Sequence, residues 1–316
     1  MTILVTGGAG YIGSHIVHNL IQSRYKVLVL DDLSTGFLDR VPKECQFIEY
    51  KLGGEARDLK QKLSKFRINS VIHLAALKSV QESIQNPKLY SKLNVGGLEE
   101  LLEALDADNL ERFVFSSSAS VYGNPKNGTV SENSKTQPIS PYGRTKLEGE
   151  KLVDSYGIKF GVNTISLRYF NVAGALNSQL ADRVAINLFP IILQAHKQNH
   201  TFEVFGGLLE TKDGSCIRDY IHVQDLATLH IAALRWCKSD TAPRTINIGS
   251  GTGTSVLEVL AALSNSLEQE IKYKISDPRE GDPVELVANN DLLMRLEPDF
   301  EFASIQDIAD TTVKFL

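Results

Sequence analysis

Hydrophobic positions in the first half of the chain form short runs separated by longer stretches with helical spacing. Runs rich in valine, isoleucine, leucine and phenylalanine lie near residues 2–6, 26–31, 46–49, 70–74, 112–117 and 161–168. Between them, apolar positions recur every three or four residues, roughly over 11–23, 55–66, 87–106 and 141–156. Such alternation predicts βαβ units and a parallel sheet covered by helices.

The pattern loosens after about residue 170. Helical spacing is expected near 184–198, 223–237 and 255–268, and short strands near 202–205, 245–248 and 271–275. We therefore predict a Rossmann-type, doubly wound α/β domain over residues 1–170. A smaller mixed α/β domain is expected over 171–316, and some of its segments could return to the first domain.

Two helices carry clear boundary signals. Ser140 and Pro141 are typical of an N-cap and a first helical position, and Gly157 is expected just beyond the final turn of that helix. Ser255 followed by Glu258 before an apolar run predicts a capping box.

The composition limits the possible partners and location. The 316 residues include 33 Lys+Arg and 38 Asp+Glu, a net charge of −5, without a long basic run. We therefore expect neither nucleic acid nor a membrane as partner, and favour a small molecule. Cys45, Cys216 and Cys237 form no CxxC pattern, and no leader-like segment opens the sequence, so a cytoplasmic protein is expected.

A glycine-rich segment follows the first expected strand and opens the first expected helix. Gly7, Gly10 and Gly13 are spaced G-x-x-G-x-x-G, which lets a pyrophosphate approach the backbone at a helix N-terminus. The next strand ends in Asp31 and Asp32. A carboxylate there can bind the adenosine ribose and repels a 2′-phosphate, which favours NAD over NADP.

Two other patterns are interpreted as structural and not as ligand-binding motifs. The second glycine loop, 249–253, is followed by a strand without a terminal acid, so we interpret it as a packing loop. His196 and His200 have i, i+4 spacing but flank no glutamate, and no metal site is expected.

Tyr142 and Lys146 lie four residues apart, on one face of the helix expected over 141–156. A cation about 4 Å from a phenol, at an effective dielectric of about 20, could lower its pKa from ~10 to ~7. Ser118 lies just after a strand, at the edge where open α/β sheets bind ligands, and could bond the same substrate hydroxyl. Taken alone, this spacing is also common on solvated helix faces.

The chain resembles the extended short-chain dehydrogenase/reductase family and, within it, the UDP-glucose 4-epimerases (UDP-galactose 4-epimerases). Eight motifs in family order carry the resemblance: Val5–His15, His73–Lys78, Asn94–Val95, Ser116–Gly123, Pro141–Lys146, Leu167–Asn171, Arg218–Val223 and Arg279–Asp282. It implies 4-epimerisation of a UDP-hexose through a 4-keto intermediate, with NAD as cofactor, and we expect a homodimer.

The resemblance also implies roles for individual residues. Ser118, Tyr142 and Lys146 would carry the chemistry. The NAD site would comprise Gly7, Gly10, Tyr11, Ile12, Gly13, Asp31, Asp32, Lys78, Asn94, Tyr142, Lys146 and Phe170. The UDP-sugar would contact Ser118, Tyr142, Asn171, Asn187, Leu188, Phe205, Arg218, Arg279 and Asp282. The two arginines suit a pyrophosphate on physical grounds as well, because each guanidinium is a planar fork of donors.

Some positions keep alternatives open. Ala119 and Ser120 stand where dehydratase and decarboxylase relatives carry an acid, which favours epimerisation alone. Lys51 replaces the acid that commonly meets adenine, and Leu286 leaves the sugar ambiguous. A UDP-uronic acid or a UDP-N-acetylhexosamine could therefore be the substrate. An inactive dinucleotide-binding sensor is the alternative from another class.

Overall fold

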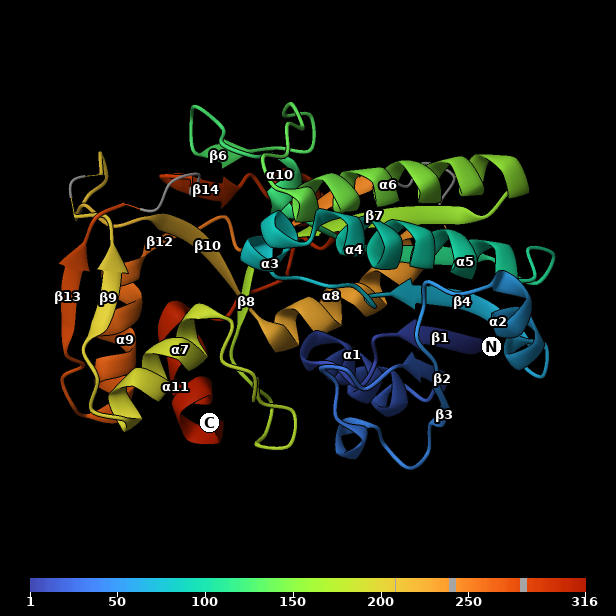
Figure 1. Ribbon diagram of the computed structural model, residues 1–316, viewed down its shortest axis with the longest axis horizontal. Coiled ribbons are helices and arrows are strands. Elements are labelled where there is room, and N and C mark those ends of the chain that lie inside the picture. Colours follow the sequence, from blue (N-terminus) through green and yellow to red (C-terminus); the bar gives the residue numbers. More distant parts are fainter. Residues whose placement is uncertain (208, 239–242, 279–282) are drawn as a thin grey trace. The chain divides into compact units, whose positions relative to one another are not determined.

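The computed structural model describes residues 1–207, 209–238, 243–278 and 283–316 (Figure 1). These residues group into two compact units. The first comprises residues 1–121, 138–168 and 227–246, and the second comprises 122–137, 169–226 and 247–316. The main change of unit, at 168/169, lies near the expected boundary at 170. Two segments lie outside the expected simple division, 122–137 in the second unit and 227–246 in the first.

The strands are β1 (Thr2–Thr6), β2 (Lys26–Asp31), β3 (Gln46–Glu49), β4 (Ile68–His73), β5 (Arg112–Ser118), β6 (Thr129–Val130), β7 (Asn163–Tyr169), β8 (Asn171–Ala173), β9 (Phe202–Phe205), β10 (Ile217–His222), β11 (Thr245–Ile248), β12 (Gly253–Ser255), β13 (Tyr273–Ser276) and β14 (Glu285–Ala288). The helices are α1 (Tyr11–Gln22), α2 (Ala56–Leu63), α3 (Val80–Gln85), α4 (Pro87–Tyr90), α5 (Gly97–Ala104), α6 (Pro141–Phe160), α7 (Leu188–Lys197), α8 (Val223–Trp236), α9 (Val256–Leu267), α10 (Asp291–Leu296) and α11 (Ile305–Phe315).

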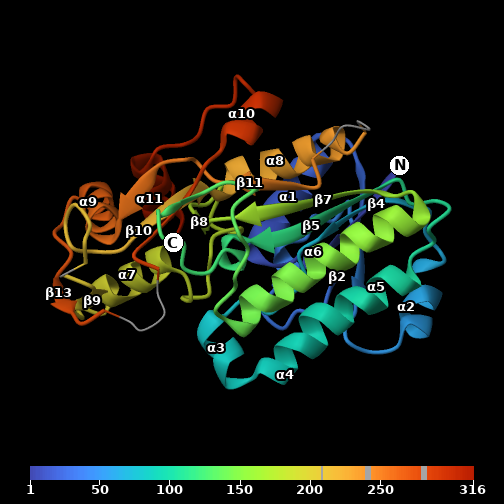
Figure 2. The same ribbon diagram turned by 90° about the horizontal axis from the view of Figure 1, so that it is seen from above.

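The first unit is built on a seven-stranded sheet in the order β11-β7-β5-β4-β1-β2-β3. The pairings of β1 with β2 and β4, of β2 with β3 and of β4 with β5 are parallel. Helices α5 and α6 run side by side on one side of this sheet, and α1 and α8 lie on the other (Figure 2). Leu4, Leu28, Val71 and Phe113 belong to its buried core. This doubly wound arrangement confirms the predicted Rossmann-type α/β fold.

Helix α6 begins as predicted but ends later. Ser140 Oγ accepts a hydrogen bond from Gly143 N at 3.1 Å, and Pro141 is the first helical residue. The prediction that Gly157 lies beyond the helix was wrong, because the helix continues to Phe160 and ends at Gly161, whose φ is 70°. A Cβ on Gly157 would lie 2.7 Å from the Val162 carbonyl oxygen. Gly157 is therefore required for this close packing.

The helix expected over 87–106 is divided into three parts. Helix α4 and helix α5 flank the π-helical segment Ser91–Gly96. Asn94 lies in this segment, where the wider turn changes the direction of its side chain relative to a regular helix.

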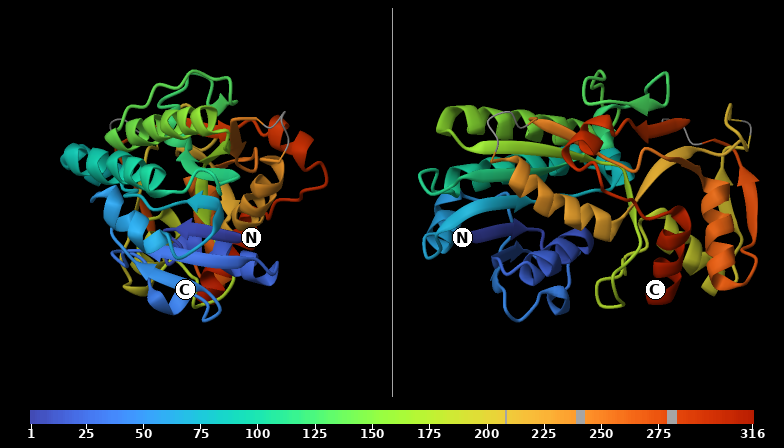
Figure 3. Two further views of the ribbon diagram at one scale, coloured as in Figure 1. Left: turned by 90° about the vertical axis from the view of Figure 1, so that its right-hand side faces the viewer. Right: turned by 180° about the vertical axis from the view of Figure 1, so that it is seen from behind.

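The second unit contains strands in the order β12-β10-β14-β6, with β8 also paired to β10, and a separate pair of β9 and β13. The β10–β12 pairing is antiparallel, whereas β10 pairs in parallel with β8 and β14. Helices α9 and α11 lie side by side (Figure 3) and bury Val259, Leu263 and Ile308. The predicted capping box of Ser255 and Glu258 is confirmed at the start of α9.

The second glycine loop binds a carboxylate of the chain itself. Asp219 in β10 is fully buried and accepts hydrogen bonds from Ser250 N at 2.8 Å and Gly251 N at 3.0 Å. A Cβ on Gly249 would lie 2.6 Å from Asp219 Oδ2. The backbone N–H groups of this loop therefore hold an internal anion, which confirms its interpretation as a packing loop.

Within the described ranges, no helix is both long and apolar enough to cross a bilayer. No three His, Cys, Asp or Glu side chains of the same ranges are grouped as metal ligands. His196 lies in the last turn of α7, whereas His200 lies beyond its end.

His73 in β4 is a buried, neutral imidazole. Its ring stacks on Phe115 with centroids 5.9 Å apart, and Nδ1 lies 2.8 Å from Thr6 Oγ1. Burial, together with a smaller effect of the positive charge of Lys146, lowers the pKa of His73 from 6.5 to about 3.

This lowered pKa predicts a loss of stability in mild acid. Below pH 6.5 the unfolded chain binds a proton at this histidine that the folded chain excludes until about pH 3. Stability should therefore fall with decreasing pH by up to ~1.4 kcal/mol per unit in this window, or ~2 kcal/mol between pH 6.5 and 5. Urea unfolding of His73→Asn should show a correspondingly smaller loss between pH 7 and 5. An unchanged loss would contradict the assignment of a neutral, buried His73.

Candidate active site

The first glycine loop leaves no room for side chains. Gly7 has a φ of 72°, and a Cβ there would lie 2.8 Å from Ala75 N. A Cβ on Gly13 would overlap the carbonyl oxygen of Gly7. Gly10 is the N-cap of α1 and supplies no side-chain cap, so the helix N-terminus can be approached by an anion. Tyr11 and Ile12 form the first turn of α1. This geometry fits the predicted pyrophosphate-binding loop.

The acid at the end of β2 also fastens this loop. Asp31 Oδ2 accepts a hydrogen bond from Ala9 N at 3.0 Å, and Oδ1 accepts one from Leu33 N at 2.9 Å. Burial raises the pKa of Asp31, although these hydrogen bonds oppose the rise. Each carboxylate oxygen retains a second lone pair that a ribose hydroxyl could use. Asp32 accepts hydrogen bonds from the backbone and side chain of Ser34.

The remaining predicted NAD residues of the first unit differ in exposure. Lys78 is exposed, after β4. Asn94 is buried. Its side-chain amide accepts a hydrogen bond from Leu77 N at 2.8 Å and donates hydrogen bonds to Leu77 O at 3.0 Å and to Thr145 Oγ1 at 3.1 Å. Asn94 therefore fixes the segment next to Lys78. Lys51 is exposed, after β3.

Ser118, Tyr142 and Lys146 come together where β5 ends and α6 begins. A hydrogen bond joins the side chains of Ser118 and Tyr142. Lys146 Nζ lies 5.9 Å from the centroid of the Tyr142 ring and donates to the Ser116 carbonyl at 2.7 Å. Lys146 is buried, and Tyr142 is half-buried. The structure thus brings the three predicted catalytic side chains together within one unit.

The charge states in this cluster differ from the expectation. Burial raises the pKa of Tyr142, and the hydrogen bond with Ser118 offsets only part of that rise. The prediction that Lys146 lowers the pKa of Tyr142 was wrong for the chain by itself. The ammonium donates a hydrogen bond to a backbone carbonyl, and the phenolate is poorly solvated. Burial lowers the pKa of Lys146 to about 8, against the effect of Glu150, which raises it. Tyr142 is therefore a neutral phenol unless another positive charge lies close to it.

Apart from Ser118 and Tyr142, the described residues predicted to contact the nucleotide sugar lie in the second unit, as does Phe170 of the predicted NAD site. Phe170 is buried, Asn171 is exposed at the start of β8, and Phe205 is half-buried at the end of β9. Asn187 donates to Asp182 Oδ2 at 2.5 Å just before α7, which begins at Leu188. Arg279 and Asp282 lie outside the described residues.

Arg218 in β10 lies beside the residue that left the sugar ambiguous. In the parallel pairing of β10 with β14, Arg218 is the partner of Leu286. The guanidinium is half-buried, with Nη1 2.9 Å from the Ile217 carbonyl, whereas Leu286 is buried. The predicted pyrophosphate ligand is therefore adjacent to the predicted determinant of sugar size.

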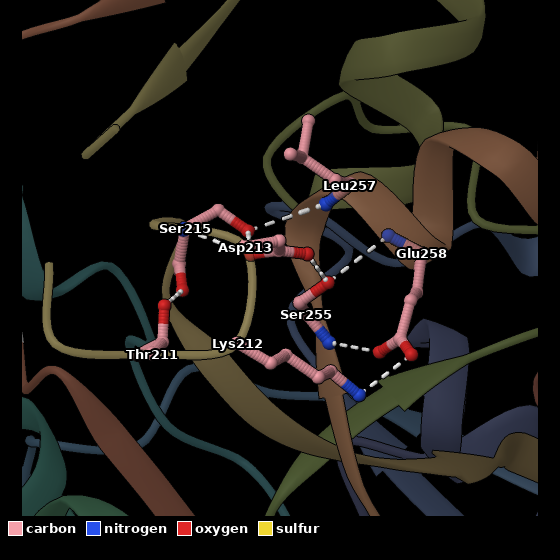
Figure 4. Close-up of polar contacts among 7 residues, drawn as sticks. All are labelled: Thr211, Lys212, Asp213, Ser215, Ser255, Leu257 and Glu258. Atoms are coloured by element: carbon pink, nitrogen blue, oxygen red, sulfur yellow. Dashed lines mark hydrogen bonds and ion pairs between the residues drawn. The ribbon is translucent and has the colours of Figure 1, made fainter. Parts of the chain in front are cut away.

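The loop between Phe205 and Arg218 is fastened to the start of α9 (Figure 4). Asp213 accepts hydrogen bonds from Ser215 N at 2.9 Å and from the Ser255 hydroxyl. Ser255 Oγ also accepts the Glu258 N–H at 3.1 Å, and Lys212 pairs with the Glu258 carboxylate at 2.6 Å. The capping box thus holds both α9 and the loop that joins two predicted substrate residues.

A buried group beside the catalytic set escaped the sequence analysis. Glu150 lies one helical turn after Lys146 and pairs with Arg168 of β7 at 2.7 Å. The available signal was the repeated spacing of four residues from Tyr142 to Lys146 and from Lys146 to Glu150, which places all three on one face of α6.

The fold and these side chains define a class of protein, a Rossmann-type α/β protein suited to binding a dinucleotide beside a tyrosine and a lysine. The model of the NAD dependent epimerase/dehydratase family matches residues 3–249. The chain belongs to this family.

Known proteins extend the similarity over nearly the whole chain. UDP-glucose 4-epimerase of Lacticaseibacillus casei is 39% identical over 298 residues, which cover 92% of this chain and 89% of that protein. The crystal structure of the Stenotrophomonas maltophila UDP-glucose 4-epimerase with bound NAD and formylated UDP-arabinopyranose has a TM-score of 0.93 and 35% identity, covering 100% of this chain and 97% of that one. The UDP-Glc/GlcNAc 4-epimerase of Campylobacter jejuni has a TM-score of 0.87 and 31% identity, covering 99% and 98%.

Proposed function

We propose that this chain interconverts UDP-glucose and UDP-galactose by NAD-dependent oxidation and re-reduction at C4 of the hexose. The observation that carries the proposal is the cluster of Ser118, Tyr142 and Lys146 at the carboxyl edge of the sheet. Ala119 and Ser120, which follow directly, supply no carboxylate for chemistry at a neighbouring carbon. The relatives named UDP-glucose 4-epimerase support the same reaction.

The cluster assigns a part of the reaction to each side chain. Tyr142, once ionised, accepts the proton of the O4 hydroxyl and later returns it. Ser118 shares the hydrogen bond of that proton, and the Lys146 ammonium stabilises the phenolate. The residues predicted to bind uridine diphosphate, such as Arg218, would hold that part of the substrate, so that the 4-keto sugar can turn about its link to the pyrophosphate. Tight binding of one sugar pose would oppose that turn.

The glycine loop and Asp31 fit NAD. When bound, NAD would supply the acceptor for the C4 hydride and the donor that returns it to the sugar. Gly7, Gly10 and Gly13 would hold the pyrophosphate, and Asp31 the adenosine ribose. The positive charge of the nicotinamide would stabilise the negatively charged phenolate of Tyr142. Ionisation of the phenol should therefore depend on the oxidised cofactor.

The test uses three UDP-sugars without added cofactor. UDP-galactose, UDP-GalNAc and UDP-galacturonate are incubated separately with the purified chain, and products are separated by chromatography. We expect UDP-glucose from UDP-galactose, with NAD carried by the protein. The similarity to a UDP-Glc/GlcNAc 4-epimerase supports a second candidate substrate, UDP-GalNAc, whose N-acetyl group Leu286 would have to accommodate. A sensor would convert none of the three sugars, and that result would contradict an epimerase.

The assembly and location are proposed separately. Leu89 in α4 and Ile158 and Phe160 in α6 are 41%, 68% and 45% exposed, which supports a homodimer formed through this side of the first unit. Cys45, Cys216 and Cys237 are unpaired, which supports a reducing cytoplasm. Analytical ultracentrifugation of Ile158→Glu against the parent chain tests the dimer, and an unchanged sedimentation coefficient would contradict this interface.

A further inference from the structure

Helix α6 carries a buried carboxylate to which the proposed reaction gives no part. The Glu150 carboxylate accepts hydrogen bonds from Arg168 Nε at 2.8 Å and Arg168 Nη2 at 2.7 Å. Ser117 Oγ donates a third at 2.5 Å. The Arg168 and Glu150 side chains are only 7% and 9% exposed. Because desolvation offsets most of the attraction in a buried pair, stability alone is a weak explanation for these charges.

Successive turns of α6 engage the three serines at the end of β5. Lys146 Nζ bonds the Ser116 carbonyl, the Glu150 carboxylate bonds the Ser117 hydroxyl, and Tyr142 bonds the Ser118 side chain. A rotation or a one-residue slide of α6 would break all three contacts together.

Other contacts hold α6 close to the sheet. A Cβ on Gly149 would overlap the Phe115 ring, so this glycine allows the close approach to β5. Arg168 belongs to β7, the strand next to β5 in the sheet, and its two parallel bonds fix the plane of the Glu150 carboxylate. Glu150 thus connects α6 to two adjacent strands.

We propose that Glu150, held by Arg168 and Ser117, is a positioning residue that keeps Lys146 and Tyr142 in register with the serines of β5. The inference rests on the proposed function, because it requires Tyr142 and Lys146 to be the reacting pair. Glu150 itself would touch neither substrate nor cofactor.

The charge of Glu150 should also influence Lys146. Burial lowers the pKa of Lys146, and Glu150 raises it. The other groups that face the ammonium are Tyr142 on α6, the neutral His73 on β4 and the Ser116 carbonyl with the Phe115 ring on β5. Loss of the Glu150 charge would remove the attraction that raises the pKa of Lys146, so Lys146 should lose its proton at a lower pH.

The first test compares Glu150→Gln with Glu148→Gln, which alters an exposed carboxylate on the same helix. For Glu150→Gln we expect a kcat at pH 8 that is about 10-fold to 100-fold lower, with KM for UDP-galactose changed less than about 3-fold. The alkaline limb of the kcat profile should move to lower pH by about one unit. Glu148→Gln should match the parent chain. A parental kcat and pH profile in Glu150→Gln would overturn the proposal.

A double variant separates positioning from simple structural support. Glu150→Gln combined with Arg168→Met removes both buried charges, and it should regain much of the Tm that Glu150→Gln loses. If the pair only supports the fold, kcat and the alkaline limb return as well, which contradicts the proposal. If Glu150 positions the pair, both remain displaced. If Glu150→Gln alone fails to fold, the double variant still tests whether Glu150 positions Lys146 and Tyr142.

A third measurement does not depend on turnover. NMR titration of ¹³C-labelled lysine, with the Lys146 signal identified by its absence in Lys146→Arg, reports the pKa of Lys146 in the substrate-free chain. It should fall from about 8 by about one unit in Glu150→Gln. If the parent chain converts no UDP-sugar, the proposed function is lost, whereas an unchanged Lys146 titration contradicts only the link to Glu150.

Discussion

Replacing Tyr142 with phenylalanine should lower kcat for UDP-galactose by about 10²-fold to 10⁴-fold, the usual contribution of a general base. The phenol is the side chain that bonds Ser118 and lies above the Lys146 ammonium. Only its oxygen is removed, so the ring contacts and the bound dinucleotide should be retained. Steady-state kinetics and the NAD content of the purified protein, measured together, test this expectation.

Tyr156 offers a matched control on the same helix. It is buried, and its hydroxyl has no hydrogen-bond partner among the described residues. Tyr156→Phe should therefore leave kcat unchanged, because the lost oxygen makes no contact to replace. If Tyr142→Phe kept more than about a tenth of the parental kcat, Tyr142 could not be the main base.

Replacing Gly13 with alanine should remove the dinucleotide from the purified protein. The new methyl group would overlap the Gly7 carbonyl, and it would lie 2.8 Å from the Gly8 Cα. Both neighbours are backbone atoms, so the loop itself must shift, at a cost of about 1–3 kcal/mol. A loss of this size weakens NAD binding by about 5-fold to 150-fold. The bound NAD of heat-denatured protein and the activity with and without added NAD measure the effect.

Gly96 provides the comparison for that substitution. A Cβ there meets nothing within 4 Å, and its φ of −60° suits any residue. Gly96→Ala should keep its NAD and gain up to about 1 kcal/mol of stability. Full NAD retention in Gly13→Ala would falsify the assignment of this loop to the pyrophosphate.

The sequence predicted most where the signals were local. The glycines of the first loop, the acid at the end of β2 and the N-caps of α6 and α9 depend on nearby residues, and the structure has each of them. The four-residue spacing of Tyr142 and Lys146 placed both on one helix face.

The features that the sequence did not predict depend on distant contacts. Strand β10 is paired with β14, more than 60 residues later, and the Arg218–Leu286 register follows only from that pairing. Gly157 resembled a helix end, but its role is to pack against Thr164. The raised pKa of Tyr142 depends on burial, which a helical spacing cannot reveal.

The carboxylate of Asp219 makes the two glycine loops differ in their capacity to bind an anion. The backbone N–H groups of the loop at 249–253, which leads into β12, are bonded by the Asp219 carboxylate, whereas the N-terminus of α1 has no side-chain cap. A free nucleotide or phosphate in the cell therefore meets competition from a tethered anion at one loop but not at the other. Asp219 should therefore help to confine dinucleotide binding to the first glycine loop.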